Sequence, residues 1–66
     1  MTKVFTRTWA PGGMNTIALG HLLLQEMQAA GVPVVGVLWP MGVTSGELVC
    51  VYDEVFEELT FTWRDL

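Results

Sequence analysis

The octapeptide VPVVGVLW, residues 32–39, decides how this chain is expected to fold. It is rich in β-branched residues, ends in a tryptophan and stops at Pro40, so its composition predicts a strand. Strands that are apolar on both faces are usually covered on both faces in folded proteins. The expected strand is apolar on both, with Val32, Val34 and Leu38 on one face and Val35, Val37 and Trp39 on the other.

The residues before this stretch predict a strand and a helix. Residues 3–9, KVFTRTW, have the β-branched and aromatic composition of a strand. A helical pattern follows over about 16–30, which Asn15 or Thr16 can cap and which Gly31 ends. A crossover through a helix between two parallel strands is right-handed in nearly all proteins, and it places the helix on one face of the sheet. We therefore predict that residues 3–9 and 32–39 run parallel.

The residues after this stretch predict two further strands. PMGVTSG, residues 40–46, is typical of a turn, and residues 47–52 and 58–63 alternate as strands. The pattern of residues 53–57 is ambiguous between a turn and one turn of helix. The prediction is a single α+β domain over residues 1–66, with one helix on a four-stranded mixed sheet in the order β-α-β-β-β.

The size and composition of the chain favour self-association. Sixty-six residues, 52% of them hydrophobic, form only a marginal core without a disulfide, a metal or a partner. Cys50 and His21 are the only residues of their kinds, which excludes an internal disulfide and argues against a cysteine–histidine metal site. We therefore expect a homo-oligomer or an obligate protein partner, with no metal and no cofactor.

Charge and hydropathy exclude other classes of partner. The net charge of −4 lacks the basic footprint that nucleic-acid binding needs. No apolar run is long enough for a membrane span, and no secretory signal is recognisable. A lone cysteine is compatible with the cytoplasm, which is the expected location.

The predicted helix carries more apolar surface than one sheet face can cover. Its polar strip is narrow, and a second apolar flank lies beside the first. Together with the second face of the expected strand over 32–39, this flank forms a predicted contact surface between subunits. The predicted interface residues are Ala18, Leu22, Glu26, Ala29, Val35 and Val37.

The tryptophans suggest a ligand site. Trp9, Trp39 and Trp63 each end a strand that runs in the same direction in the predicted fold, so all three should stand at one edge. Glycines and a helix N-terminus there could accept an anion, and indole faces could stack on a flat ring. The predicted ligand-binding residues are Trp9, Gly12, Gly13, Asn15, Trp39 and Arg64. Burial of the indoles in the core or an interface is the competing interpretation.

The remaining polar residues offer little chemistry. Cys50 lies within an apolar strand, where cysteine is usually a small buried hydrophobe, and His21 lies on the polar strip of the helix. We expect a small non-catalytic interaction or assembly protein. The alternatives are a binding module for a planar anion such as a nucleotide or flavin, an acidic inhibitor that docks on a basic protein, and a catalytic pair built across subunits from Glu26, His21 or Cys50. The acidic patch of the inhibitor hypothesis comprises Asp53, Glu54, Glu57 and Glu58.

Overall fold

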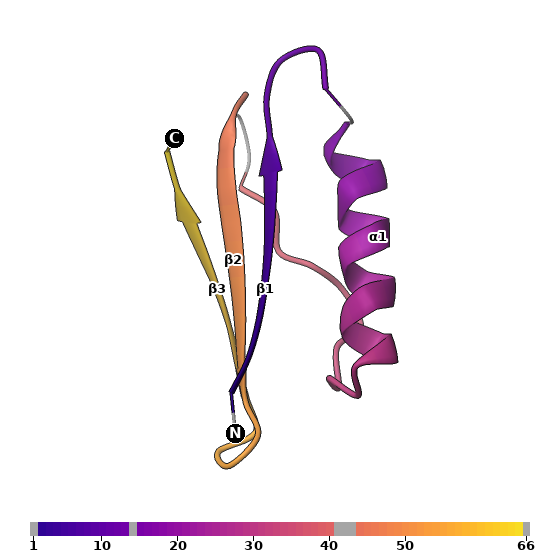
Figure 1. Cartoon of the computed structure of the whole chain (residues 1–66), viewed down its shortest axis with the longest axis vertical. Coiled ribbons are helices and arrows are strands. Elements are labelled where there is room, and N and C mark those ends of the chain that lie inside the picture. The colour runs from indigo at the N-terminus through magenta and orange to yellow at the C-terminus, as the bar shows by residue number, and fades with distance from the viewer. Residues whose placement is uncertain (1, 14, 41–43, 66) are drawn as a thin grey trace.

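The computed structural model describes residues 2–13, 15–40 and 44–65. The chain forms a strand, a helix and then two strands, a small α+β fold. Figure 1 shows the helix standing beside the strands. The elements are β1 (Thr2–Trp9), α1 (Thr16–Ala29), β2 (Gly46–Asp53) and β3 (Glu58–Arg64).

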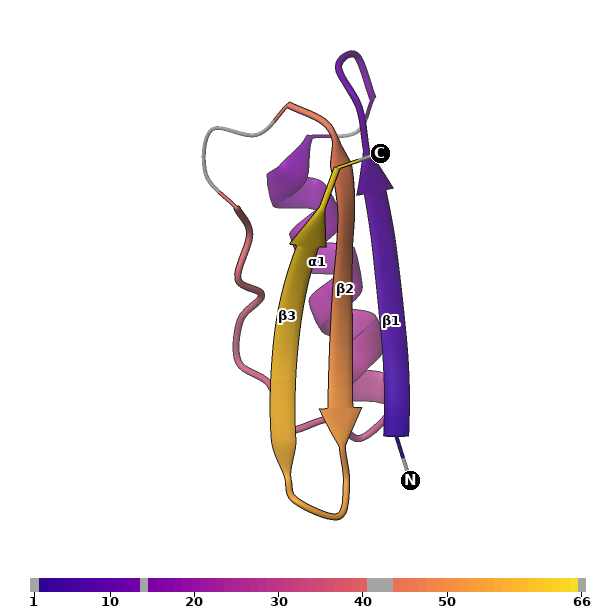
Figure 2. The same cartoon turned by 90° about the vertical axis from the view of Figure 1, so that its left-hand side faces the viewer.

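The three strands form one antiparallel sheet in the order β1-β2-β3. β2 is the central strand, and its register places Cys50 between Phe5 of β1 and Phe61 of β3. Figure 2 shows the sheet face on, with α1 behind it and residues 32–40 running along the β3 side. The sheet therefore has one covered face, and no other strand of the described residues pairs with the outer edge of β1 or of β3.

The predicted strand over residues 32–39 is wrong, and with it the four-stranded mixed sheet. Residues 32–40 have no regular secondary structure, and β2 takes the place beside β1. Pro33 has no N–H to donate to a ladder. The Val34 N–H donates instead to the Val32 carbonyl at 2.9 Å, and the Val34 carbonyl accepts from Gln28 Nε2 at 3.0 Å. These local bonds occupy the groups of Val34 that a sheet would need.

The predicted helix is confirmed, and both of its ends form as expected. The Ala18 N–H donates to Asn15 Oδ1 at 2.8 Å, so Asn15 is the N-cap. At the other end Gly31 has a φ of 86°, a conformation that glycine adopts readily. The Gly31 N–H then bonds to the Gln28 carbonyl and the Val32 N–H to the Met27 carbonyl, each at 3.0 Å. This is the Schellman arrangement, which satisfies the last carbonyls of the helix.

The three strands that form were also predicted, and no end of a strand differs from its predicted position by more than one residue. The ambiguous segment between β2 and β3 is a turn over residues 54–57. Asp53 Oδ1 accepts the N–H groups of Val55 at 2.9 Å and Phe56 at 3.3 Å, and Glu57 takes a φ of 54°. An aspartate that bonds to the backbone two residues ahead is a common turn former. The turn of residues 40–46 includes 41–43, which lie outside the described residues.

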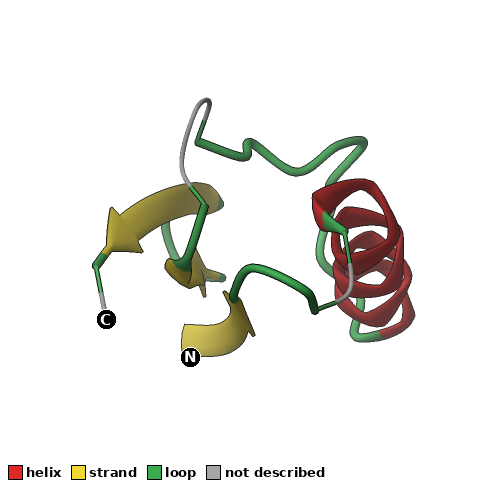
Figure 3. Cartoon of the chain, turned by 90° about the horizontal axis from the view of Figure 1, so that it is seen from above, coloured by secondary structure: helices red, strands yellow, loops and turns green. Residues whose placement is uncertain are grey.

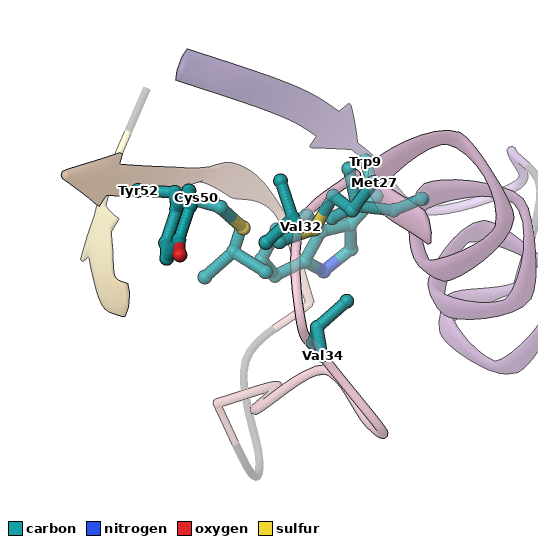
Figure 4. Close-up of a cluster of buried hydrophobic side chains, with 8 residues drawn as sticks. Trp9, Met27, Val32, Val34, Cys50 and Tyr52 are labelled. Carbon is teal, nitrogen blue, oxygen red and sulfur yellow. The ribbon is translucent and has the colours of Figure 1, made fainter. Parts of the chain in front are cut away.

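The core fills the space between the sheet, α1 and the segment after the helix. Figure 3 shows these three parts enclosing a common interior, and Figure 4 shows Val32 among Trp9, Met27 and Cys50. The segment thus contributes to the core without joining the sheet. The buried hydrophobic residues are Trp9, Leu23, Met27, Val32, Val34, Leu48, Cys50 and Tyr52.

The other face of the sheet is uncovered in this chain. It presents Val4, Val49 and Val51 at its centre, flanked by threonines and charged residues. Antiparallel sheets commonly leave one such face to solvent. The expectation that a second sheet face must be covered depended on the strand over 32–39, so the structure removes that argument. Within the described ranges, no helix has the length and apolar character that a bilayer span requires.

Candidate functional site

The three tryptophans meet at one end of the sheet. Trp9 is the last residue of β1, and Trp63 is the last but one of β3, which runs in the same direction; Trp39 belongs to the segment after α1. The ring centroid of Trp9 lies 4.6 Å from that of Trp39 and 4.4 Å from that of Trp63, with tilts of 47° and 37°. Trp9 is only 6% exposed. The Trp9 ring therefore packs against both other indoles, and its burial leaves little of it open to a stacked ligand ring.

The other predicted ligand-binding residues do not join the tryptophans in one slot. Gly12 and Gly13 lie in an exposed turn after β1, and Asn15 uses its side chain to cap α1. Arg64 follows Trp63 in β3, so its side chain points to the opposite, uncovered face of the sheet. There the Arg64 guanidinium pairs with Glu47. The structure therefore separates the cation from the indole rings.

A groove of about 290 Å³ lies between the first half of α1 and the segment after the helix. A side chain at Gly20 would meet no atom within 4 Å, so this glycine leaves the groove wall open. Trp39 forms the facing wall, and its Nε1 is buried with no acceptor among the described residues. The residues that line the groove include Ile17, Gly20, His21, Leu24, Val37 and Trp39. Sequence reasoning missed this groove because it placed residues 32–39 in the sheet.

The predicted interface residues of the helix divide between two environments. Leu22 is 48% exposed and Ala29 is exposed, whereas Ala18 is half-buried. Glu26 pairs with Arg7 of β1, so its charge is met within the chain. On the segment after the helix, Val35 is 98% exposed, and Val37 packs against the core. An apolar flank thus remains on α1, with Leu22 as its largest member.

The acidic patch is partly used inside the chain. Asp53 forms the turn described above, and Glu54 Oε1 lies 2.9 Å from the Lys3 ammonium. The hydrogen bond and positive charge of Lys3 lower the pKa of Glu54. Lys3 Nζ also donates to the Ala30 carbonyl at 2.5 Å, which ties β1 to the end of α1. Glu57 and Glu58 are exposed.

The candidate catalytic residues lie apart. His21 faces the groove, Glu26 is bound to Arg7, and Cys50 lies in the sheet with 0% exposure. Within the part of the chain that the structure describes, no three histidine, cysteine or carboxylate residues are grouped to hold a metal. Burial raises the pKa of the Cys50 thiol from 9.0 to about 11, although the charge of Arg7 opposes the rise. The thiol is therefore protonated at neutral pH, which is the inert form.

Burial of Cys50 predicts a loss of stability at alkaline pH. Between pH 9 and about 11 the unfolded thiol ionises while the folded thiol stays protonated, so the unfolded state binds fewer protons. The free energy of unfolding should fall as pH rises through this range. Urea unfolding of the wild type and of Cys50→Ala across the range isolates this contribution, because the other titrating groups are shared. Equal pH slopes for the two proteins would contradict the prediction.

No family model matches this chain, and no match was found among curated proteins or solved structures.

Proposed function

We propose that this chain is a small non-catalytic assembly protein that acts by associating with copies of itself. The observation that carries the proposal is the apolar surface exposed by α1 and the segment after it. Ile17 is 76% exposed, Leu38 is 71% exposed and Val35 is 98% exposed. Full burial of one such side chain contributes about 1.5–3 kcal/mol, so contact between copies has a clear driving force.

The small size of the chain supports the same proposal. Among the residues that the structure describes, eight hydrophobic side chains are buried, in a chain of 66 residues. Domains of this length commonly gain stability from an additional contact, and oligomerisation is one way to obtain it. The single cysteine fits a reducing cytoplasm, which we propose as the compartment, and the charge of −4 makes nucleic acid a poor partner.

The mass in solution tests this proposal. Sedimentation of the pure chain over a range of concentrations should show a mass above 7.3 kDa that rises with concentration. Leu22→Glu places a charge on the exposed apolar flank of α1 and should lower that mass. Gln25→Glu adds the same charge at an exposed polar position and should not. A wild type that stays monomeric at every concentration would contradict self-association.

A second candidate function is the binding of a small planar ligand in the groove. The hollow beside Trp39 favours it, because an indole wall suits a flat aromatic ring. The described residues that line the groove include no lysine or arginine, so this lining favours an uncharged ring over the anionic ligand suggested by the sequence. Fluorescence titration with free adenine, flavin and nicotinamide rings would detect such binding. A response that survives in Trp39→Phe would place the ligand elsewhere.

A further inference from the structure

Two strands of the sheet have a free edge, and they differ in charge. β1 and β3 are the outer strands of the sheet order. The backbone hydrogen bonds of the described residues include none to the outward edge of β3. A free edge is a template for pairing with another strand, unless charges or bulges prevent it.

We propose that two copies of the chain join through antiparallel pairing of β3 with β3, about a two-fold axis at Phe61. This inference depends on the proposed self-association and names one of its contacts. The two sheets of three strands then form one continuous sheet across the pair. The same surface is used on both copies, so the contact closes as a dimer and does not propagate.

The sequence of β3 is complementary to itself in this register. Residues directly opposite in an antiparallel pair lie on the same face of the sheet. With Phe61 opposite Phe61, Thr60 lies opposite Thr62 and Leu59 opposite Trp63. At each end of the paired strands, Glu58 of one copy then lies opposite Arg64 of the other, which gives two ion pairs. All seven residues of the strand take part in this register.

The charges of β3 are poorly matched within one chain. Glu58 lies opposite Asp53 of β2, and like charges in that position are unfavourable. Among the described residues no cation pairs with Glu58. Arg64 is bound to Glu47 yet keeps a side chain 67% exposed, and a guanidinium has five N–H donors. Arg64 of one copy can therefore donate hydrogen bonds to the Glu58 carboxylate of the other copy while it stays bound to Glu47.

The apolar residues of β3 are also incompletely covered. Leu59, Phe61 and Trp63 point to the covered face of the sheet, but each is only half-buried. Pairing would place these three beside the same three of the second copy. The apolar cores of the two copies would then be continuous across the β3–β3 interface.

β1 is a poor alternative for the same contact. In the corresponding register centred on Phe5, Lys3 lies opposite Arg7, which sets like charges against each other. These two side chains already bind Glu54 and Glu26 within the chain. Charged residues on an edge strand are a known means of preventing edge pairing.

Cysteine trapping tests the register. Thr60 and Thr62 are exposed on the uncovered face, whereas Cys50 is fully buried. Directly opposite strand residues lie about 4.5–5.5 Å apart, within the range of a disulfide. Under oxidised glutathione a mixture of Thr60→Cys and Thr62→Cys should form a covalent dimer, and neither variant alone should. If Thr60→Cys cross-linked by itself, the two-fold axis would lie at Thr60. If Thr62→Cys cross-linked by itself, the axis would lie at Thr62. Either result overturns the proposal.

Charge exchange tests the ion pairs. Glu58→Arg sets arginine against Arg64, and Arg64→Glu sets glutamate against Glu58, so each variant alone should dimerise at least tenfold more weakly. Mixing the two restores opposite charges at both ends and should recover the dimer. A monomeric wild type would overturn self-association itself. A wild type that associates, with no recovery on mixing and no disulfide in the cysteine mixture, would overturn the β3 contact alone.

Discussion

Gly46→Ala is expected to unfold a large part of the protein at room temperature. A methyl group at this position would lie 1.6 Å from Trp63 Cη2 and within 2.4 Å of two further ring atoms. The backbone also has a φ of 148°, which residues with a side chain rarely adopt. Overpacking of this kind costs about 1–3 kcal/mol, and the backbone strain adds about 1–3 kcal/mol more. The hydrophobic core of a domain this small rarely supplies more than about 3–5 kcal/mol of stability.

The effect should reach the tryptophan cluster as well as the stability. Trp63 can only make room by moving its ring, and that ring packs on Trp9. Near-ultraviolet circular dichroism should therefore lose the signal of the packed indoles, and the urea midpoint should fall. Gly20→Ala is the matched control, because its methyl group meets no atom within 4 Å. Alanine inside a helix should stabilise the chain by about 0.5–1 kcal/mol. A Gly46→Ala midpoint equal to that of the wild type would contradict the packing of Trp63.

The elements that sequence could predict are those fixed by neighbouring residues. α1 begins at an asparagine whose side chain reaches the backbone three residues ahead, and it ends at a glycine that supplies a positive φ. β3 has a strict alternation of apolar residues and threonines, and the structure gives it one half-buried face and one exposed face. Such signals depend on a few adjacent residues, so they survive whatever the rest of the chain does.

The sheet could not be predicted in the same way, because strand pairing is a choice among distant segments. Residues 32–39 have the composition of a strand, yet β2 pairs with β1 along eight positions from Thr2↔Asp53 to Trp9↔Gly46. β2 has no proline, whereas Pro33 removes a donor near the start of its competitor. Strand propensity measures how well a residue fits a half-buried surface. Val32 and Val34 find a buried surface without joining a strand, because they pack into the core from a loop.

The candidate site shows the same division. The common edge of Trp9 and Trp63 follows from strand direction, whereas the place of Trp39 depends on the path of residues 32–40. The separation of Arg64 from the indoles was available from the sequence. Adjacent residues of a strand point to opposite faces, so Arg64 could not share a slot with Trp63. The groove depends on two segments that only the fold brings together, and no local pattern indicates it.

Leu48→Ala is the second substitution with a large expected effect. Leu48 lies in the middle of the sheet, opposite Arg7 of β1 and Trp63 of β3, and is 1% exposed. Truncation of a fully buried leucine to alanine lowers the free energy of unfolding by about 2–5 kcal/mol. The protein loses the burial of the side chain, and the cavity left behind is only partly filled by its neighbours. Because the described core is small, few neighbouring side chains are available to move into the cavity. We therefore expect the urea midpoint of Leu48→Ala to fall to near zero denaturant.

The next residue of the same strand provides the control. Val49 points to the uncovered face, where it is half-buried beside Thr6 and Thr62. Val49→Ala removes two carbons where Leu48→Ala removes three, and it removes them from a surface that stays in contact with solvent. The loss of stability should therefore be below about 1 kcal/mol. Urea unfolding of both variants at one protein concentration compares the two faces directly. If Val49→Ala were the more destabilising of the two, the uncovered face would be the one that is packed, and the assignment of α1 to the Leu48 face would be wrong.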